Sequence, residues 1–233
     1  MPLDTSQLTH FALFAGLPPV ALQYIAEHSN LRRIRSDNSI VHQDDPGETF
    51  YVIQHGTVKI STTLPDGGEV FLALLAAGDT FGEMSLIDSS TRSADVNTQE
   101  ETTVISVSRI AFDHLMDNYP MFARNLMKLL ARRLRLANVR IQAHCALDVY
   151  GMVARQILEF AELYGEKKED ESVHIPIRLT QGSMAELVGA SRERVNHVMV
   201  NYRQRGFIAV DTAYHITVLK PKDLQRELEI RSH

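Results

Sequence analysis

Cysteine is nearly absent from this sequence, since Cys145 is the only one among 233 residues. A single thiol excludes an intramolecular disulfide and, within one chain, a cysteine-held iron–sulfur cluster or a cysteine-rich zinc site. Long apolar runs are also missing, because none approaches the ~18 residues of a membrane span. The N-terminus shows no basic stretch followed by an apolar core, and so no signal peptide is visible. We therefore expect a cytoplasmic protein without a membrane partner.

An excess of positive charge is lacking as well, and the formal net charge is −5. This sign argues against a protein that coats nucleic acid without sequence preference, but it permits DNA binding through a local basic face. The 10 histidines form no spaced metal motif, and no nucleophile–base arrangement is evident. We expect His42 at the surface, His55 in a turn and His144 in a helix seam. The sequence thus predicts neither a metal site nor an enzyme.

The first half of the chain changes from a helical residue pattern to a β-rich one. Apolar spacing over residues 8–29 predicts two short helices with a break at Pro18-Pro19. From about residue 31 to 109, short β-rich runs alternate with turn signals, which is typical of a β-sandwich or barrel-like roll. These runs are Ser39–Val41, Phe50–Ile53, Thr57–Ile60, Val70–Leu74 and Thr102–Val107.

Residues 121–147 contain no Gly or Pro and predict one long helix. Side chains recur along it at alternating spacings of three and four, the heptad pattern by which a helix packs against a copy of itself. The members of this seam are Met127, Leu130, Leu134, Ala137, Ile141 and His144. The pattern favours a homodimer formed through residues 121–147, and packing of the helix on its own domain is the alternative.

A small α/β unit is expected after the long helix, with the boundary at 147/148. Asp148 resembles an N-cap for a helix over residues 149–163, and residues 165–171 form a charged loop. A helical pair, two strand-like runs and a polar tail follow, at residues 181–205, 207–210, 216–218 and from Pro221 onward. The predicted domains are residues 1–115, 116–147 and 148–233.

Residues 82–94 bring together groups that suit a sugar phosphate. Arg92 offers a forked, charge-assisted grip on phosphate oxygens. Backbone N–H groups from Gly82 through Met84 to Ser85, at the start of a one-turn helix, would point at the same anion. Glu83 can accept a hydrogen bond from a ribose 2′-hydroxyl, and Ser93 supplies a hydroxyl. The segment predicts a cyclic-nucleotide site, although Glu83 and Arg92 taken singly also fit solvated surface positions.

A helix-turn-helix is predicted over residues 180–206. Thr180 and Ser191 are N-cap residues, Gly189 and Ala190 make the turn, and Gly206 ends the second helix. Four side chains are exposed at the N-terminal end of this second helix: Arg192, Glu193, Asn196 and His197.

These side chains have the chemistry of a major-groove reader. Arg can donate two hydrogen bonds to guanine, and Glu can accept one from cytosine. Ser191 and Gln181 are placed to meet phosphates, which fix the register without reading sequence. Seven basic and three acidic side chains between residues 172 and 222 give a local charge of +4. A plain helical hairpin with a solvated charged face is the alternative.

Both motifs resemble one family. Gly82–Ile87 with Thr91–Ala94 is similar to the phosphate-binding cassette of cyclic-nucleotide-binding domains, and Gly189–Val195 resembles the recognition segment of the cyclic-AMP receptors of the CRP/FNR family. The resemblance runs over nearly the whole chain. It implies an α+β fold: an N-terminal cyclic-nucleotide-binding β-roll (jelly-roll-like), a long dimerisation helix and a C-terminal winged helix-turn-helix.

The resemblance also implies roles for single residues. Gly82, Glu83, Arg92 and Ser93 would hold ribose and phosphate, whereas Ala137 and Asn138 stand where the family has a Thr-Ser pair facing adenine. Because Asn138 has both a donor and an acceptor, it suits an adenine amine or a guanine edge. Cyclic AMP is expected first because it is the more frequent effector in the family that the chain resembles, cyclic GMP is second, and a pocket that binds no nucleotide is the third reading.

The same resemblance suggests a two-fold DNA operator with TGTGA-like half-sites. His197 replaces the usual third base-reading Arg, so the position that it reads would be altered. RNA polymerase is an expected partner, through the 164–172 loop or the Pro65–Gly68 turn. The remaining alternatives are a CRP/FNR-type regulator responding to haem, a redox cue or no signal, a phosphodiesterase, and a purely structural dimeric module.

Overall fold

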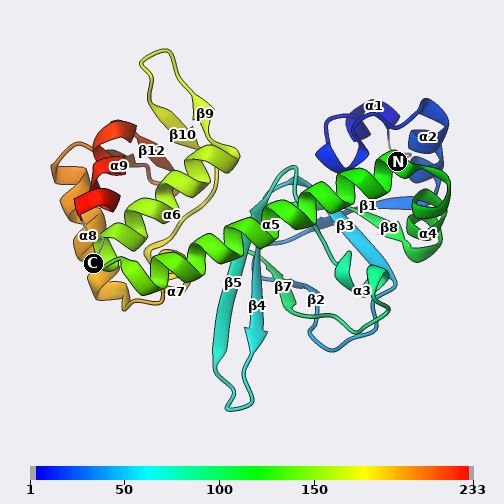
Figure 1. The fold of residues 1–233 in the computed structure, drawn as a ribbon, viewed down its shortest axis with the longest axis horizontal. Helices are drawn as coiled ribbons and strands as arrows, with labels where there is room; N and C mark the ends of the chain where they lie inside the picture. The colour runs from blue at the N-terminus through cyan, green and yellow to red at the C-terminus, as the bar shows by residue number, and fades with distance from the viewer. Residues whose placement is uncertain (1–3, 231–233) are drawn as a thin grey trace. The chain divides into compact units, whose positions relative to one another are not determined.

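The computed structural model describes residues 4–230, and the chain divides between Arg135 and Leu136 into two compact units (Figure 1). The outer ends of the predicted first and last domains, residues 1–3 and 231–233, lie outside the described residues. Within residues 4–230, no helix is both long enough and apolar enough to cross a membrane.

Three short helical segments begin the first unit: α1 (Thr5–Leu8), a 3-10 turn (Ala12–Phe14) and α2 (Pro19–Glu27). Pro19 fits the first position of α2, because a proline there leaves no intrahelical hydrogen bond unmade. The predicted break at Pro18-Pro19 is confirmed. No α-helix forms over the expected stretch before this break, because α1 ends at Leu8 and only the 3-10 turn Ala12–Phe14 follows.

Two four-stranded sheets, antiparallel throughout, form the predicted β-roll. The first has the order β1 (Ser29–Ile34), β8 (Thr102–Ser108), β3 (Thr49–His55) and β6 (Thr80–Phe81). The second has the order β2 (Ser39–Val41), β7 (Asp95–Thr98), β4 (Thr57–Thr63) and β5 (Glu69–Ala76). The sequence prediction missed β1, β6 and β7. None of these shows a run of apolar residues, and β1 is exposed along most of its length.

The roll is closed by apolar side chains on its inner faces, among them Ile53, Val58 and Val104. A second cluster joins β3 and β8 to the helices, where Phe50 meets Phe112 of α4 (Arg109–Asn118) and Phe122 of α5 (Pro120–Ala146). One-turn helix α3 (Met84–Ile87) lies between β6 and β7. The first part of α5 thus packs on the same core as strands β3 and β8 and as Leu86 of α3.

The long helix predicted at residues 121–147 is found as α5, within one residue at each end, whereas residues 116–118 of the predicted 116–147 segment belong to α4. Phe122 and Leu126 are buried, and Leu130 packs against the same core. Met127, Leu134 and Ile141 are 63%, 64% and 63% exposed. Three large apolar side chains spaced seven residues apart are therefore in contact with solvent in the single chain.

Within residues 136–230, the second unit contains four helices after α5 and one antiparallel sheet. Its helices are α6 (Val149–Tyr164), α7 (Gln181–Val188), α8 (Arg192–Gln204) and α9 (Pro221–Ile230). Its sheet has the order β11 (Ile208–Val210), β12 (Ile216–Val218), β10 (Val173–Ile175) and β9 (Glu166–Lys167). Asp148 caps α6 as predicted, accepting a hydrogen bond from the Gly151 backbone N–H at 2.9 Å.

Two expectations for this unit were incomplete. The charged loop at residues 165–171 contains β9, which pairs with β10 although both its residues are exposed. The polar tail is helix α9, which packs on α6 and buries Leu224 and Glu227. Few of its residues are apolar, and so composition alone did not reveal that one face is buried.

Candidate functional site

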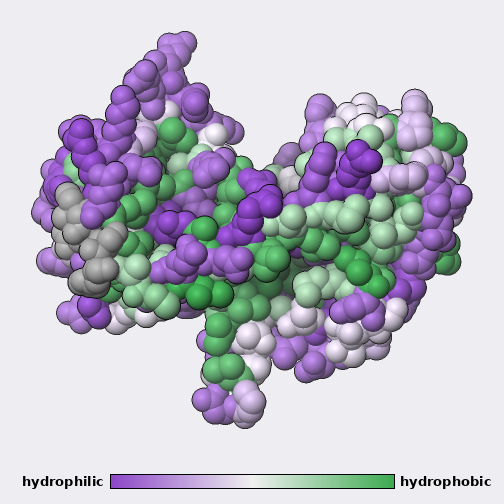
Figure 2. Space-filling view, viewed as in Figure 1, coloured by the Kyte–Doolittle hydropathy of each residue, from purple (hydrophilic) through white to green (hydrophobic). Residues whose placement is uncertain are grey.

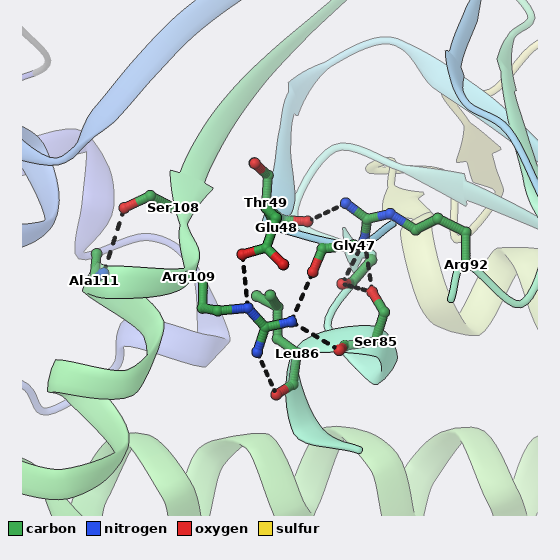
Figure 3. Close-up of polar contacts among 10 residues, drawn as sticks. Gly47, Glu48, Thr49, Ser85, Leu86, Arg92, Ser108, Arg109 and Ala111 are labelled. Carbon is green, nitrogen blue, oxygen red and sulfur yellow. Dashed lines mark hydrogen bonds and ion pairs between the residues drawn. The ribbon is translucent and has the colours of Figure 1, made fainter. Parts of the chain in front are cut away.

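Arg92 points into the fold toward the start of α3 (Figure 3). Its Nη1 donates to the Gly82 carbonyl oxygen at 2.8 Å and to Ser85 Oγ at 2.9 Å, and its Nη2 donates to the Thr49 carbonyl oxygen at 2.6 Å. The side chain is 6% exposed, and no carboxylate among residues 4–230 forms an ion pair with it. Burial lowers the pKa of Arg92, although Tyr51 and Glu83 act in the opposite direction. The site therefore contains a desolvated cation without an anionic partner.

Arg109 holds the same segment from its other side. Its Nε donates to Glu48 Oε2 at 2.8 Å, and its Nη2 donates to the carbonyl oxygens of Gly47 at 2.8 Å and Ser85 at 3.2 Å. Figure 3 shows the two guanidinium groups directed at the Gly47–Thr49 segment and at Ser85. Since Ser85 is bonded through its hydroxyl and through its carbonyl, the first turn of α3 is fixed on both sides.

Two glycines make this approach sterically feasible. A Cβ atom on Gly47 would lie 2.1 Å from Ser85 Oγ, a separation that real atoms do not show. Gly82 has φ +80°, and a Cβ there would lie 2.6 Å from Arg92 Nη1. A side chain at either position would displace Ser85 or Arg92.

Glu83 is placed differently from a solvated turn residue. Its side chain is 2% exposed, and its Oε1 lies 2.6 Å from Nη1 of Arg133 on α5. Arg133 also donates to the Thr80 carbonyl oxygen. Glu83 Oε2 is shielded from solvent and has no hydrogen-bond partner in the structure. A buried carboxylate oxygen that accepts nothing is uncommon, and Oε2 is therefore open to a donor from outside the chain.

Three further residues predicted to contact the ligand, Met84, Ser93 and Asn138, are exposed to solvent. Met84 is 51% exposed, and Ser93 is exposed with its hydroxyl 4.0 Å from the Met84 sulfur. The backbone N–H groups of Glu83, Met84 and Ser85 have no acceptor within the part of the chain that the structure describes. Asn138 is an exposed residue of α5 and belongs to the second unit.

The helix-turn-helix has the predicted local chemistry. Thr180 Oγ1 accepts from the Ser183 N–H at 3.1 Å, and Ser191 Oγ accepts from the Arg194 N–H at 3.3 Å. Gly189, between the helices, is left-handed with φ +62°. Val195 is fully buried, as are Val198 and Met199 to within a few per cent, and these contacts seat α8 on its unit.

The predicted base-reading residues lie on the opposite, exposed face of α8. Arg192, Glu193, Asn196 and His197 are all exposed within the first half of the helix, next to exposed Ser191. Asn196 Oδ1 accepts a hydrogen bond from Gln181 Nε2 of α7 at 2.7 Å. The His197 ring packs edge-to-face with Tyr150, with centroids 6.3 Å apart.

An open groove of about 750 Å³ borders this face. It runs between the start of α6 and α8, and its lining includes Asp148, Tyr150, Asn196 and His197. The groove makes the side chains at the front of α8 accessible from one side. On the face drawn in Figure 2, hydrophilic colouring covers the outer part of this unit.

Three residues that bond or closely approach Glu83 and Ser85 were not among the predicted site residues: Arg133, Arg109 and Gly47. Their partners are distant in sequence, so no local pattern could have revealed them. Across residues 4–230, His, Cys, Asp and Glu side chains form no group that could hold a metal ion.

Comparison with protein families matches residues 31–119 to the cyclic nucleotide-binding domain and residues 153–227 to the Crp-like helix-turn-helix domain. The CRP-like cAMP-activated global transcriptional regulator of Mycobacterium tuberculosis is 32% identical over 204 residues, which is 88% of this chain and 91% of that protein. The cyclic AMP receptor protein of Thermus thermophilus is 30% identical over 196 residues, 84% of this chain and 87% of that protein.

Solved structures share the fold. FixK2 from Bradyrhizobium japonicum superposes with a TM-score of 0.75 at 20% identity, covering 85% of this chain and 96% of that one. The two domain matches, the relatives and the architecture agree. The chain therefore belongs to the CRP/FNR family and is a CRP-like DNA-binding transcription regulator, with a cyclic nucleotide-binding domain before a helix-turn-helix domain.

Proposed function

We propose that this regulator is a homodimer whose DNA binding is controlled by a cyclic nucleotide held at Gly82–Ser85, Arg92 and Ser93. The observation that carries the proposal is the Oε2 atom of Glu83, which is buried and accepts no hydrogen bond. A ribose 2′-hydroxyl is a neutral donor and would satisfy this oxygen. No second positive charge is needed, because Arg133 already neutralises Glu83.

The charges fit a ligand with one negative charge. Glu83 and Arg133 compensate each other, which leaves Arg92 as the uncompensated cation of the site. The cyclic phosphate of a nucleotide carries a single charge, and the free N–H groups of Glu83, Met84 and Ser85 supply further donors. The exposed hydroxyl of Ser93 supplies one more.

Cyclic AMP is the effector that we propose first, because relatives at 32% and 30% identity are named as cAMP-activated or cyclic AMP receptor proteins. Cyclic GMP is second, since Asn138 offers both a donor and an acceptor to a base where Ala137 offers neither from its side chain. The phosphate and sugar contacts are common to both nucleotides.

Dimerisation would use the exposed stripe of Met127, Leu134 and Ile141 on α5. The same helix carries Arg133, so a ligand that contacts Glu83 acts on a residue bonded to the dimerisation helix. Ligand binding would then favour a conformation in which the DNA-reading units are rotated about residues 147–149. The ligand can shift this equilibrium only as far as it binds the DNA-competent state more tightly than the other state.

The proposed operator has two-fold symmetry and TGTGA-like half-sites. Arg192, Glu193 and His197 would read bases, and Ser191 would contact phosphate. RNA polymerase is the proposed partner at promoters, in the cytoplasm.

The sugar contact gives the sharpest test. Calorimetry should show that the full-length protein binds cyclic AMP at least tenfold more tightly than 2′-deoxy cyclic AMP, because the deoxy analogue leaves Glu83 Oε2 unsatisfied. Equal affinities would show that Glu83 does not hold the ribose. Absence of binding for cyclic AMP and cyclic GMP alike would overturn the nucleotide-sensing function.

A further inference from the structure

The contact between Gln181 and Asn196 links the two helices of the DNA-reading unit. Gln181 is the first residue of α7, and Asn196 is the fifth residue of α8. The donor is Gln181 Nε2 and the acceptor is Asn196 Oδ1, 2.7 Å apart. Both helix starts are fixed by their own caps, Thr180 and Ser191, so the bond joins two well-defined backbone positions.

This bond leaves Asn196 with one kind of hydrogen-bonding group. Its Oδ1 is engaged by Gln181, whereas its Nδ2 has no acceptor among residues 4–230. The residue is exposed, one turn after Arg192 and next to His197. Asn196 therefore presents two N–H donors to whatever approaches the front of α8.

Donors and acceptors are distinguished in the major groove. An unrestrained Asn prefers adenine, because its amide can donate to N7 and accept from the N6 amine at once. Guanine instead presents two acceptors, N7 and O6, in the same place. A donor-only amide matches guanine and meets the N6 amine of adenine with a second donor.

We infer that Gln181 is a positioning residue that holds Asn196 as a donor-only reader, so that Asn196 selects guanine over adenine at one operator position. The inference rests on the proposed DNA-reading function and adds a base preference to it. It also gives Gln181 a role through Asn196, in place of the phosphate contact expected from the sequence alone.

Substituting Gln181→Met tests this, because methionine keeps the length of the side chain and removes its amide. The full chain with saturating cyclic AMP is measured against a duplex library randomised in each half-site. Wild type should favour guanine over adenine about tenfold at one position. The Gln181→Met variant should shift that ratio toward adenine by about tenfold, with other positions unchanged.

A double variant separates positioning from direct contact. Asn196→Ala should abolish the preference at that position, and adding Gln181→Met to it should change the base preference no further. Thermal unfolding of each variant checks that the unit remains folded. A uniform loss of affinity in Gln181→Met across all sequences would make Gln181 a phosphate contact and overturn the inference, as would an unchanged preference. Wild type that binds all duplexes equally would overturn the proposed DNA-reading function itself.

Discussion

Arg133 Nη1 on α5 lies 2.6 Å from Glu83 Oε1, and this ion pair ties the helix to the segment that precedes α3. Glu83 is almost fully buried, whereas the Arg133 side chain is 32% exposed. One oxygen of the carboxylate is therefore bonded within the protein, and the other is buried and accepts no hydrogen bond in the structure. The residue proposed to contact the sugar, Glu83, is thus bonded directly to a residue of the proposed dimerisation helix, Arg133.

Arg133→Ala should destabilise the protein by about 3 kcal/mol, because removing one partner of a buried pair leaves a charge without compensation. Urea unfolding measures this loss of free energy. Combining Arg133→Ala with Glu83→Gln should recover much of it, since the second substitution removes the stranded charge. Arg132→Ala, one residue away and exposed, is the matched control and should change stability little. Equal effects of the two alanine substitutions would contradict a structural role for the pair.

Arg92→Ala should reduce affinity for cyclic AMP by at least a hundredfold while leaving the fold intact. The phosphate loses its principal cation, whereas the fold loses a desolvated charge whose burial already lowers the pKa of Arg92. The affinity of Arg92→Lys for cyclic AMP should lie between those of wild type and Arg92→Ala, because lysine keeps the charge and loses the forked geometry. Calorimetry gives the affinities and circular dichroism checks the fold. Unchanged affinity in Arg92→Ala would show that the phosphate binds elsewhere.

Arg192→Ala should weaken operator binding by about 1–3 kcal/mol and relax specificity at one guanine. Competition between operators that differ at single positions measures both effects. Arg203→Ala is a suitable comparison, since Arg203 is exposed near the other end of α8. It should not change base preference. If Arg192→Ala weakens all sequences to the same extent, its contact is with phosphate.

Leu134→Glu should shift the protein from dimer to monomer, because it places a charge in the middle of the exposed apolar stripe of α5. Sedimentation velocity over a range of concentrations reports the change. Arg132→Gln alters net charge by the same amount on the outer face of a heptad that begins at Met127, and it should leave association unchanged. A dimer that survives Leu134→Glu would place the interface on another surface.

Much of this architecture could be predicted because its determinants are local. Thr180, Ser191 and Asp148 each cap a helix with a side chain that bonds a nearby backbone N–H, and their residue types indicate this without any tertiary information. The long helix is similarly marked by the absence of Gly and Pro over residues 121–147.

The features that were missed depend on distant partners. Strand β1 exposes most of its residues and is recognised as a strand only by its pairing with β8. Helix α9 is held by Glu227, which reaches Arg205 of a different element at 2.7 Å. Glu83 was predicted to contact the ligand, but its bond to Arg133 was not predicted, because the two residues are 50 positions apart and no sequence pattern relates them.

Ligand control of DNA binding is the central claim, and fluorescence anisotropy of a labelled TGTGA-type duplex measures it directly. Full-length protein is titrated with no nucleotide, with cyclic AMP and with cyclic GMP at fixed salt, since salt alone changes such affinities. We expect at least a tenfold increase in affinity with one nucleotide, and none when Arg92→Ala is used. Identical affinities under all three conditions would contradict control by a cyclic nucleotide.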